Sequence, residues 1–123
     1  MAHYAAHFTK IDHTTKKLVK ELIDLDQLPH THKDILKRMF ALYSQGCVWD
    51  AFNNDMQNPE YMRTLGCKFE NGRFWWTKEI TDLPIYKILE DMSFVLSIRQ
   101  GLVAHEDTSY MEQNEKTLKE FLQ

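Results

Sequence analysis

The sequence of 123 residues lacks most of the features that mark a specialised class of protein, and each absence excludes one class. It has only two cysteines, Cys47 and Cys67, too few for the disulfide framework of a small secreted domain, and we expect buried thiols rather than a bridge. No apolar run approaches the roughly 20 residues that a membrane-spanning helix needs. The N-terminal segment also lacks the cationic start and apolar stretch of a signal peptide. We therefore expect a cytoplasmic protein that makes no contact with a membrane.

Recognised motifs for metal ions and phosphate groups are absent as well. The sequence has no glycine-rich phosphate loop, no Cys-x-x-Cys and no His-Glu-x-x-His. Two histidine pairs, His30 with His32 and His3 with His7, could each offer two imidazole ligands, and a cysteine could complete a tetrahedral zinc site. Because no accompanying motif supports either pair, we expect neither a metal ion nor another cofactor.

The composition is that of an ordinary globular protein. Hydrophobic residues make up 43% and charged residues 27% of the chain, which excludes a disordered protein and predicts one domain spanning residues 1–123. The net charge of −3 is not that of a protein whose whole surface attracts nucleic acid. An RNA-binding site must therefore be local, built around Lys16, Lys17 and Lys20 or around Arg99. The other interpretation of the lysines is a solvated helix face, the commoner use of such residues.

Apolar residues recur at intervals of three and four along most of the chain, which is the spacing of amphipathic helices. Pro29 ends the first of these stretches, and Asp82 is the expected N-cap of the third. The second stretch is the longest: its tail, 47–52, is expected deep in the core, with Gly46 a mild weakness within the helix. The sequence therefore predicts an all-α fold, a four-helix up-down bundle. Its helices are expected over residues 14–28, 31–52, 82–99 and 109–122.

A small β-hairpin is expected between the second and third helices. Asn71-Gly72 supplies the two positive-φ positions of a tight turn, with Cys67 and Phe69 in one arm and the run Phe74–Trp76 in the other. The alternative is an irregular, aromatic-rich loop.

The three adjacent rings of Phe74, Trp75 and Trp76 cannot all point the same way from a strand, so at least one is expected to be exposed or to meet a partner. An exposed ring either covers the edge of the helical core or forms a contact with a partner, such as a dimer interface or a base-stacking platform.

The stretch from Arg99 to His105 combines apolar residues with two side chains suited to phosphodiester chemistry. Arginine is permanently charged and offers a fork of donors to phosphate oxygens, and histidine titrates near neutrality. The pattern Arg99, Gln100, four residues, His105 resembles the motif of the HEPN superfamily, although Gln100 stands where the family more often has Asn, Asp or His. The resemblance implies a small helical domain of the kind found among metal-independent ribonucleases of toxin–antitoxin, abortive-infection and CRISPR defence systems.

Helix geometry limits how Arg99 and His105 could act together. Residues six apart lie about 120° apart around a straight helix and about 9 Å apart along it, so the two side chains would not meet on one phosphate. Convergence requires a break at Gly101 or a second copy of the motif from another subunit. HEPN nucleases are similar in this respect, since their sites commonly form across a two-fold dimer, and we expect a homodimer.

The leading expectation is thus an endoribonuclease in which His105 is the general base or acid, Arg99 holds the phosphate and Gln100 orients the reacting groups. The 2′-hydroxyl of the RNA would attack the adjacent phosphorus, and a cognate antitoxin is an expected partner. The alternative, from a different class, is a catalytically silent module that binds a protein through Phe74–Trp76 and its acidic C-terminal third. In that case Arg99 pairs with a carboxylate such as Glu106 or Asp107.

Overall fold

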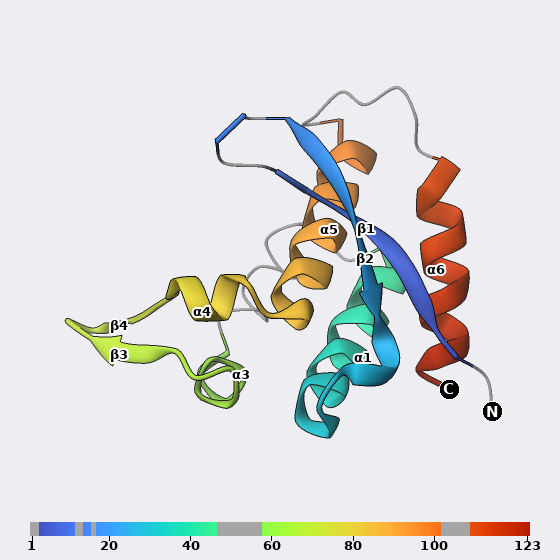
Figure 1. Ribbon diagram of the computed structural model, residues 1–123. Coiled ribbons are helices and arrows are strands. Elements are labelled where there is room, and N and C mark those ends of the chain that lie inside the picture. Colours follow the sequence, from blue (N-terminus) through green and yellow to red (C-terminus); the bar gives the residue numbers. More distant parts are fainter. Residues whose placement is uncertain (1–2, 12–13, 16, 47–57, 102–108) are drawn as a thin grey trace.

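The protein has a mixed α/β fold in the computed structural model, which describes residues 3–11, 14–15, 17–46, 58–101 and 109–123. The expected all-α four-helix bundle is therefore wrong, because two antiparallel two-stranded sheets accompany the helices (Figure 1). In chain order the elements are β1 (Ala5–Ile11), β2 (Leu18–Asp24), the 3₁₀ turn η1 (Leu25–Gln27), α1 (His30–Ser44), α3 (Pro59–Thr64), β3 (Lys68–Glu70), β4 (Arg73–Trp75), α4 (Lys78–Thr81), α5 (Pro84–Arg99) and α6 (Ser109–Phe121). No helix in the described parts of the chain is both long and apolar enough to cross a membrane.

The first expected helix, 14–28, is instead strand β2 and the turn η1. Strand β2 pairs antiparallel with β1, in a register that sets Ala6 opposite Ile23 and Ile11 opposite Leu18. The apolar residues of β2 fit the spacing of a helix and also the two-residue alternation of a strand. Ile23 is buried and Leu22, on the opposite face, is exposed, as expected of a strand. Hydrogen bonding to β1 makes the segment a strand, and no local pattern in 14–28 reveals this pairing.

Helix α1 ends at Ser44 rather than continuing to residue 52. Gly46 adopts a φ of +68°, and its N–H donates to the carbonyl of Tyr43. A glycine in the left-handed region just past the last turn is a common helix stop. Gly46 thus ends the helix instead of weakening its middle, and the segment 47–52, expected deep in the core, lies outside the described residues.

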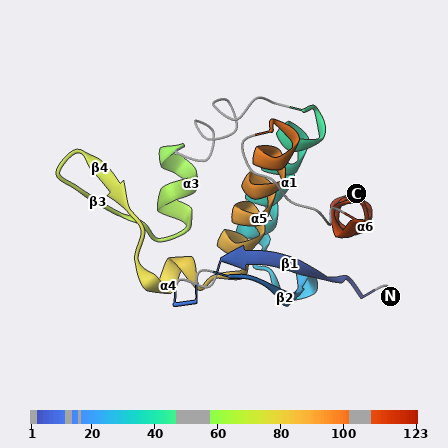
Figure 2. The ribbon, with the colours of Figure 1, turned by 90° about the horizontal axis from the view of Figure 1, so that it is seen from above.

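The core forms around α5. The expected stripe of this helix is confirmed for its six apolar members, which are all buried: Ile85, Ile88, Leu89, Met92, Val95 and Leu96. Arg99, which was expected to continue the stripe, is exposed instead. Helix α1 packs against α5, and β1 contacts both α5 and α6. Figure 2 shows the β1–β2 hairpin beside α5 and α1, with α6 near the N-terminal end of β1. Asp82 does not cap α5, which follows Leu83 without a side-chain cap; it is the C-terminal cap of α4 instead.

The expected hairpin between the helical segments is confirmed. Strands β3 and β4 pair with Phe69 opposite Phe74, and the turn residues Asn71 and Gly72 have φ values of 54° and 79°, the backbone of a type I′ turn. Together with α3 and α4, this hairpin projects to one side of the main body (Figures 1 and 2). We call residues Lys68–Trp75 the aromatic hairpin.

Candidate functional site

Arg99, the residue expected to hold a phosphate, is the last residue of α5. Gln100 is the C-cap and Gly101 has a φ of +78°, so the expected break at Gly101 is confirmed. His105 lies outside the described residues. Gln100 is exposed at the helix end.

The guanidinium of Arg99 is already engaged by other side chains. It forms an ion pair with Glu115 of α6, and its central carbon lies 5.2 Å from the ring centroid of Tyr43 on α1. A phosphate would have to compete with the carboxylate of Glu115 for the same N–H groups. The expected partners Glu106 and Asp107 also lie outside the described residues.

Tyr43 completes a cluster that joins three helices. Its hydroxyl donates to Oε1 of Glu115 over 2.6 Å, so one carboxylate from α6 binds both α1 and the end of α5. Burial, reinforced by the hydrogen bond and charge of Glu115, raises the pKa of Tyr43 above its ordinary value. The phenol therefore stays protonated and donating, which suits a structural tie better than proton transfer near neutral pH.

A buried carboxylate lies close to this cluster. Asp91 of α5 is only 3% exposed, and its Oδ2 accepts from the backbone N–H of Thr9 over 2.8 Å. Burial raises the pKa of Asp91 to about 7; the Thr9 hydrogen bond opposes this and the charge of Glu90 adds to it. Sequence reasoning missed Asp91, although it lies three residues after Ile88 and four before Val95, which places it on the buried stripe.

The cavity beside Asp91 is too small for a substrate. Its volume is about 10 Å³, and its polar lining comes from Asp91, Tyr43, Asn114 and Glu115. That is room for about one water molecule, whereas ligand pockets usually measure about 300–1,000 Å³. The cluster therefore offers a place for a bound water and no place for a nucleotide.

The two described lysines of the three expected to bind RNA do not lie on a helix. Lys17 is exposed just before β2, Lys20 is an exposed residue within β2, and Lys16 lies outside the described residues. Lys20 lines an open groove of about 410 Å³ between the β1–β2 hairpin and α6, together with His7 and Asn114. The structure thus brings one of the three lysines to a groove.

The aromatic hairpin exposes part of the expected partner-binding run. Trp75 is 39% exposed and Phe69 is 62% exposed, whereas Phe74 and Trp76 pack against the core, Trp76 with its ring 5.0 Å from that of Tyr86. The expectation that at least one of the three rings is exposed is therefore confirmed. Sequence reasoning did not single out Phe69 as the most exposed ring, because that depends on how the hairpin is held against α3 and α4.

Both faces of the aromatic hairpin are ordered by contacts to its rings. The guanidinium of Arg73 lies 3.8 Å from the ring centroid of Trp75, and the indole N–H of Trp75 donates to the carbonyl of Glu70 over 2.9 Å. Phe69 and Phe74 contact each other on the opposite face, with ring centroids 5.0 Å apart. The exposed rings are thus held in place by the hairpin itself.

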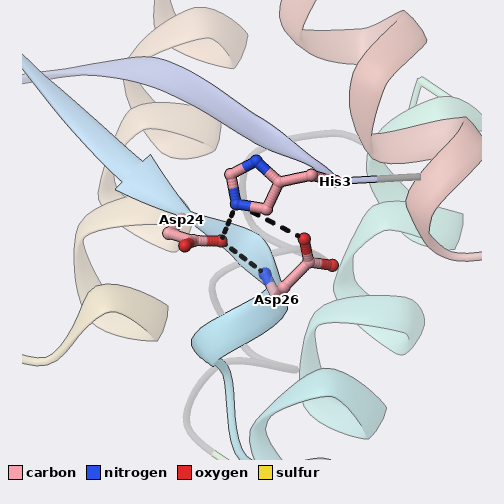
Figure 3. Close-up of side chains that lie close together, drawn as sticks. All are labelled: His3, Asp24 and Asp26. Atoms are coloured by element: carbon pink, nitrogen blue, oxygen red, sulfur yellow. Dashed lines mark hydrogen bonds and ion pairs between the residues drawn. The ribbon is translucent and has the colours of Figure 1, made fainter. Parts of the chain in front are cut away.

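A third cluster joins His3, Asp24 and Asp26 at the end of β2 (Figure 3). Nε2 of His3 lies 3.0 Å from Oδ1 of Asp24 and 3.6 Å from Oδ2 of Asp26. The hydrogen bond to Asp24, with its charge, raises the pKa of His3, and the same hydrogen bond lowers that of Asp24. These atoms could ligate a metal ion, but a protonated His3 would have to lose its proton first.

The histidines considered for a zinc site lie in other surroundings. Nε2 of His30 lies 3.6 Å from Oδ2 of Asp34 on the first turn of α1. His7 is exposed on strand β1 rather than on a helix. The sequence offers no sign of the His3 cluster, since its carboxylates lie more than 20 residues along the chain and the strand pairing brings them near.

Compared with protein-family models, curated proteins and solved structures, the chain matches none of them.

Proposed function

We propose that this protein is a non-catalytic, cytoplasmic module that binds another protein through the aromatic hairpin. The observation that carries the proposal is the exposure of Phe69 and Trp75 on a projecting hairpin. Large exposed aromatic side chains contribute little to folding and expose apolar area to water, and their burial in an interface recovers that free energy.

The residue types of the aromatic hairpin suit a protein interface. Tryptophan and arginine are enriched among the residues that dominate binding free energies, and Arg73 stacks on Trp75. Because the indole N–H is bound to Glu70 and the turn is a tight type I′ turn, these side chains lose less conformational entropy on binding than mobile ones would. The hairpin therefore presents a preorganised surface.

Charge favours a protein over a nucleic acid as the partner. Residues 60–79, which contain the aromatic hairpin, hold four basic and three acidic side chains. A surface that tracks a phosphate backbone carries a clear excess of Lys and Arg. A nearly balanced charge with exposed aromatic rings is typical of protein interfaces.

The ribonuclease stays a prediction that rests on the sequence motif alone. The ion pair between Arg99 and Glu115 is the arrangement expected of the alternative, in which the arginine pairs with an internal carboxylate. A water-sized cavity beside Asp91 offers no second place for catalysis. The contacts of Arg99 therefore favour the silent module, and a host-interfering, immunity or adaptor role suits it.

The experiment compares partners captured in cells by the tagged protein and by the double variant Phe69→Ser/Trp75→Ser. Lys68→Ser, an exposed residue of the same strand, is the matched control that keeps both rings. We expect a specific protein to be lost with the double variant and kept with Lys68→Ser. With that protein purified, calorimetry should show at least a ~30-fold weaker complex, since the rings lie on opposite faces of the hairpin and a residue of this kind within the interface contributes about 2 kcal/mol or more to binding.

Two results would overturn the proposal. One is a purified partner that binds the double variant as tightly as the unmodified protein while circular dichroism shows both folded. The other is cleavage of RNA by the purified protein in EDTA, abolished by His105→Ala, which would establish the ribonuclease instead.

A further inference from the structure

At Leu22, the outer edge of strand β2 is not covered by any of the described elements. Strand β1 packs against α5 and α6, while β2 contacts chiefly β1. The outer edge of β1 is closed by side chains: Asp91 accepts from the N–H of Thr9, and the Asn114 amide donates to the carbonyl of His7. Strand β2 has no comparable cover among the described elements.

The register shows which groups of β2 point outward. In an antiparallel pair, residues directly opposite each other either both face inward and exchange hydrogen bonds or both face away. His7 lies opposite Leu22, and the carbonyl of His7 is bound on the far side by Asn114. The N–H and C=O of Leu22 therefore point away from β1, and Leu22 has no hydrogen bond to any described segment beyond the β1–β2 pair.

The side chain of Leu22 adds an apolar contact point at the same place. It is 61% exposed, one of the largest exposed hydrophobic side chains in the described parts of the chain. An open strand edge with an exposed leucine at its centre is a template for another strand. The remaining question is which strand fits it.

We propose that the outer edge of β2 pairs with β2 of a second copy of this chain, antiparallel about a two-fold axis at Leu22. In this register Leu22 lies opposite Leu22 of the second copy. Lys20 lies opposite Asp24 of the second copy, so opposite charges meet on both sides of the axis. All of these side chains lie on the outer face, and the two hairpins form one four-stranded sheet.

The neighbouring registers are less favourable. A shift that centres the axis on Lys20 sets two lysines opposite each other, and one that centres it on Glu21 sets two glutamates opposite each other; like charges directly opposed destabilise a strand pair. A shift towards the end of β2 sets Leu22 opposite Asp24 and shortens the pairing, because β2 ends at Asp24. The charge pattern of β2 is therefore self-complementary about Leu22.

The dimer would also cover a strand edge that otherwise stays unpaired. Unpaired edges promote aggregation, and proteins usually block them with charges, bulges or covering segments. A closed two-fold pair uses the outer edge of β2 in both copies, and on the other edge of each hairpin Asp91 and Asn114 bind β1. The proposal is independent of the partner surface on the aromatic hairpin, which lies in a different part of the fold (Figure 1).

The first test is the mass of the protein in solution. Sedimentation equilibrium between about 1 and 200 µM should give a species of twice the 14.7 kDa chain mass. Leu22→Lys opposes two charges at the axis and should weaken the dimer at least tenfold. Gln45→Lys is the matched control, because it adds the same charge at an exposed position at the end of α1 and should leave the dimer unchanged. Circular dichroism verifies that both variants fold.

The second test reads the register. Opposed residues that exchange hydrogen bonds have Cα atoms about 5.5 Å apart, within disulfide range, so Leu22→Cys should form a covalent dimer under mild oxidation. In Lys20→Cys, the two new thiols lie four positions apart along the strands, about 13 Å, and should not cross-link. The unmodified protein controls for Cys47 and Cys67.

Three results would overturn the proposal. They are a monomer at 200 µM, a dimer that Leu22→Lys leaves unchanged, and cross-linking of Lys20→Cys that equals or exceeds that of Leu22→Cys. None of these results bears on binding by the aromatic hairpin, so the two proposals fail separately.

Discussion

Asp91 should make the stability of this protein fall as the pH rises through the weakly acidic range. Its pKa is raised from 3.8 to about 7 by burial. Between these two values the folded protein holds a proton on Asp91 that the unfolded chain has lost. The contribution of Asp91 to the free energy of unfolding is therefore fully present below about pH 4, falls as the pH rises towards 7, and levels off above that.

The magnitude follows from the difference between the two pKa values. The folded and unfolded pKa values of Asp91 differ by about three, and each step of one in pKa corresponds to ~1.4 kcal/mol, so the effect on the free energy of unfolding amounts to about 4 kcal/mol. Typical domains have a total stability of about 5–15 kcal/mol, so this single carboxyl has a large effect. Asp91 is 3% exposed, and little of the effect is lost to solvent screening.

The variant that isolates the effect is Asp91→Asn. The asparagine oxygen can still accept from the N–H of Thr9, and the side chain carries no charge to desolvate. Urea unfolding followed by circular dichroism at pH 5, 6, 7 and 8 should show the unmodified protein losing stability relative to the variant. At pH 8 Asp91→Asn should be the more stable protein, by up to about 4 kcal/mol.

Contributions from other titrating groups cancel in the difference between the two proteins. Asp82→Asn, an exposed acid near the start of α5, is the matched control and should follow the unmodified protein at every pH. The reasoning is refuted if the stability difference between Asp91→Asn and the unmodified protein is constant from pH 5 to 8. A constant difference would mean that Asp91 is ionised throughout.

Three further predictions concern the other clusters. Tyr43→Phe removes a hydrogen bond to a charged acceptor, Glu115, and should lower the free energy of unfolding by ~1–2 kcal/mol in urea titrations; no loss would mean that water replaces the phenol. The imidazole of His3 should titrate above its ordinary pKa of 6.5 in NMR, because of the Asp24 carboxylate, and Asp24→Asn should remove the rise; an unchanged titration would contradict the ion pair. Gly72→Ala strains a turn residue with a φ of 79° and should cost about 1 kcal/mol, while Lys68→Ala should cost less than half of that.

The elements that could be predicted are those whose signal is local. Asn71-Gly72 specifies its turn because both residues tolerate positive φ. The buried stripe of α5 follows from spacing along one helix, and Gly101 ends that helix where its φ of +78° requires a glycine. Each of these features depends on residues within a few positions of one another. The sequence therefore carries them without knowledge of the fold.

The features that could not be predicted depend on contacts between distant segments. The stretch 18–24 fits a helix by its apolar spacing, and pairing with β1 makes it a strand. Asp91 was the one buried acid on a stripe read as apolar, and its partner is the backbone of Thr9, 82 residues earlier. In both cases the unforeseen strand β1 supplies the missing partner. One error about the N-terminal hairpin thus accounts for the wrong fold class and for the overlooked carboxyl.

The same hairpin bears on how the candidate sites are interpreted. With β1 in place, α5 and α6 place side chains on its outer edge, and Asp91 and Asn114 are occupied in closing it. Glu115, one position after Asn114 on α6, then binds Arg99 and Tyr43. Among the described residues, Asp91, Tyr43, Arg99, Asn114 and Glu115 are therefore paired with one another or with backbone groups, which leaves these side chains poorly placed to act on a substrate. Exposed aromatic rings and an open strand edge lie elsewhere, on the aromatic hairpin and on β2, and both are suited to binding another chain.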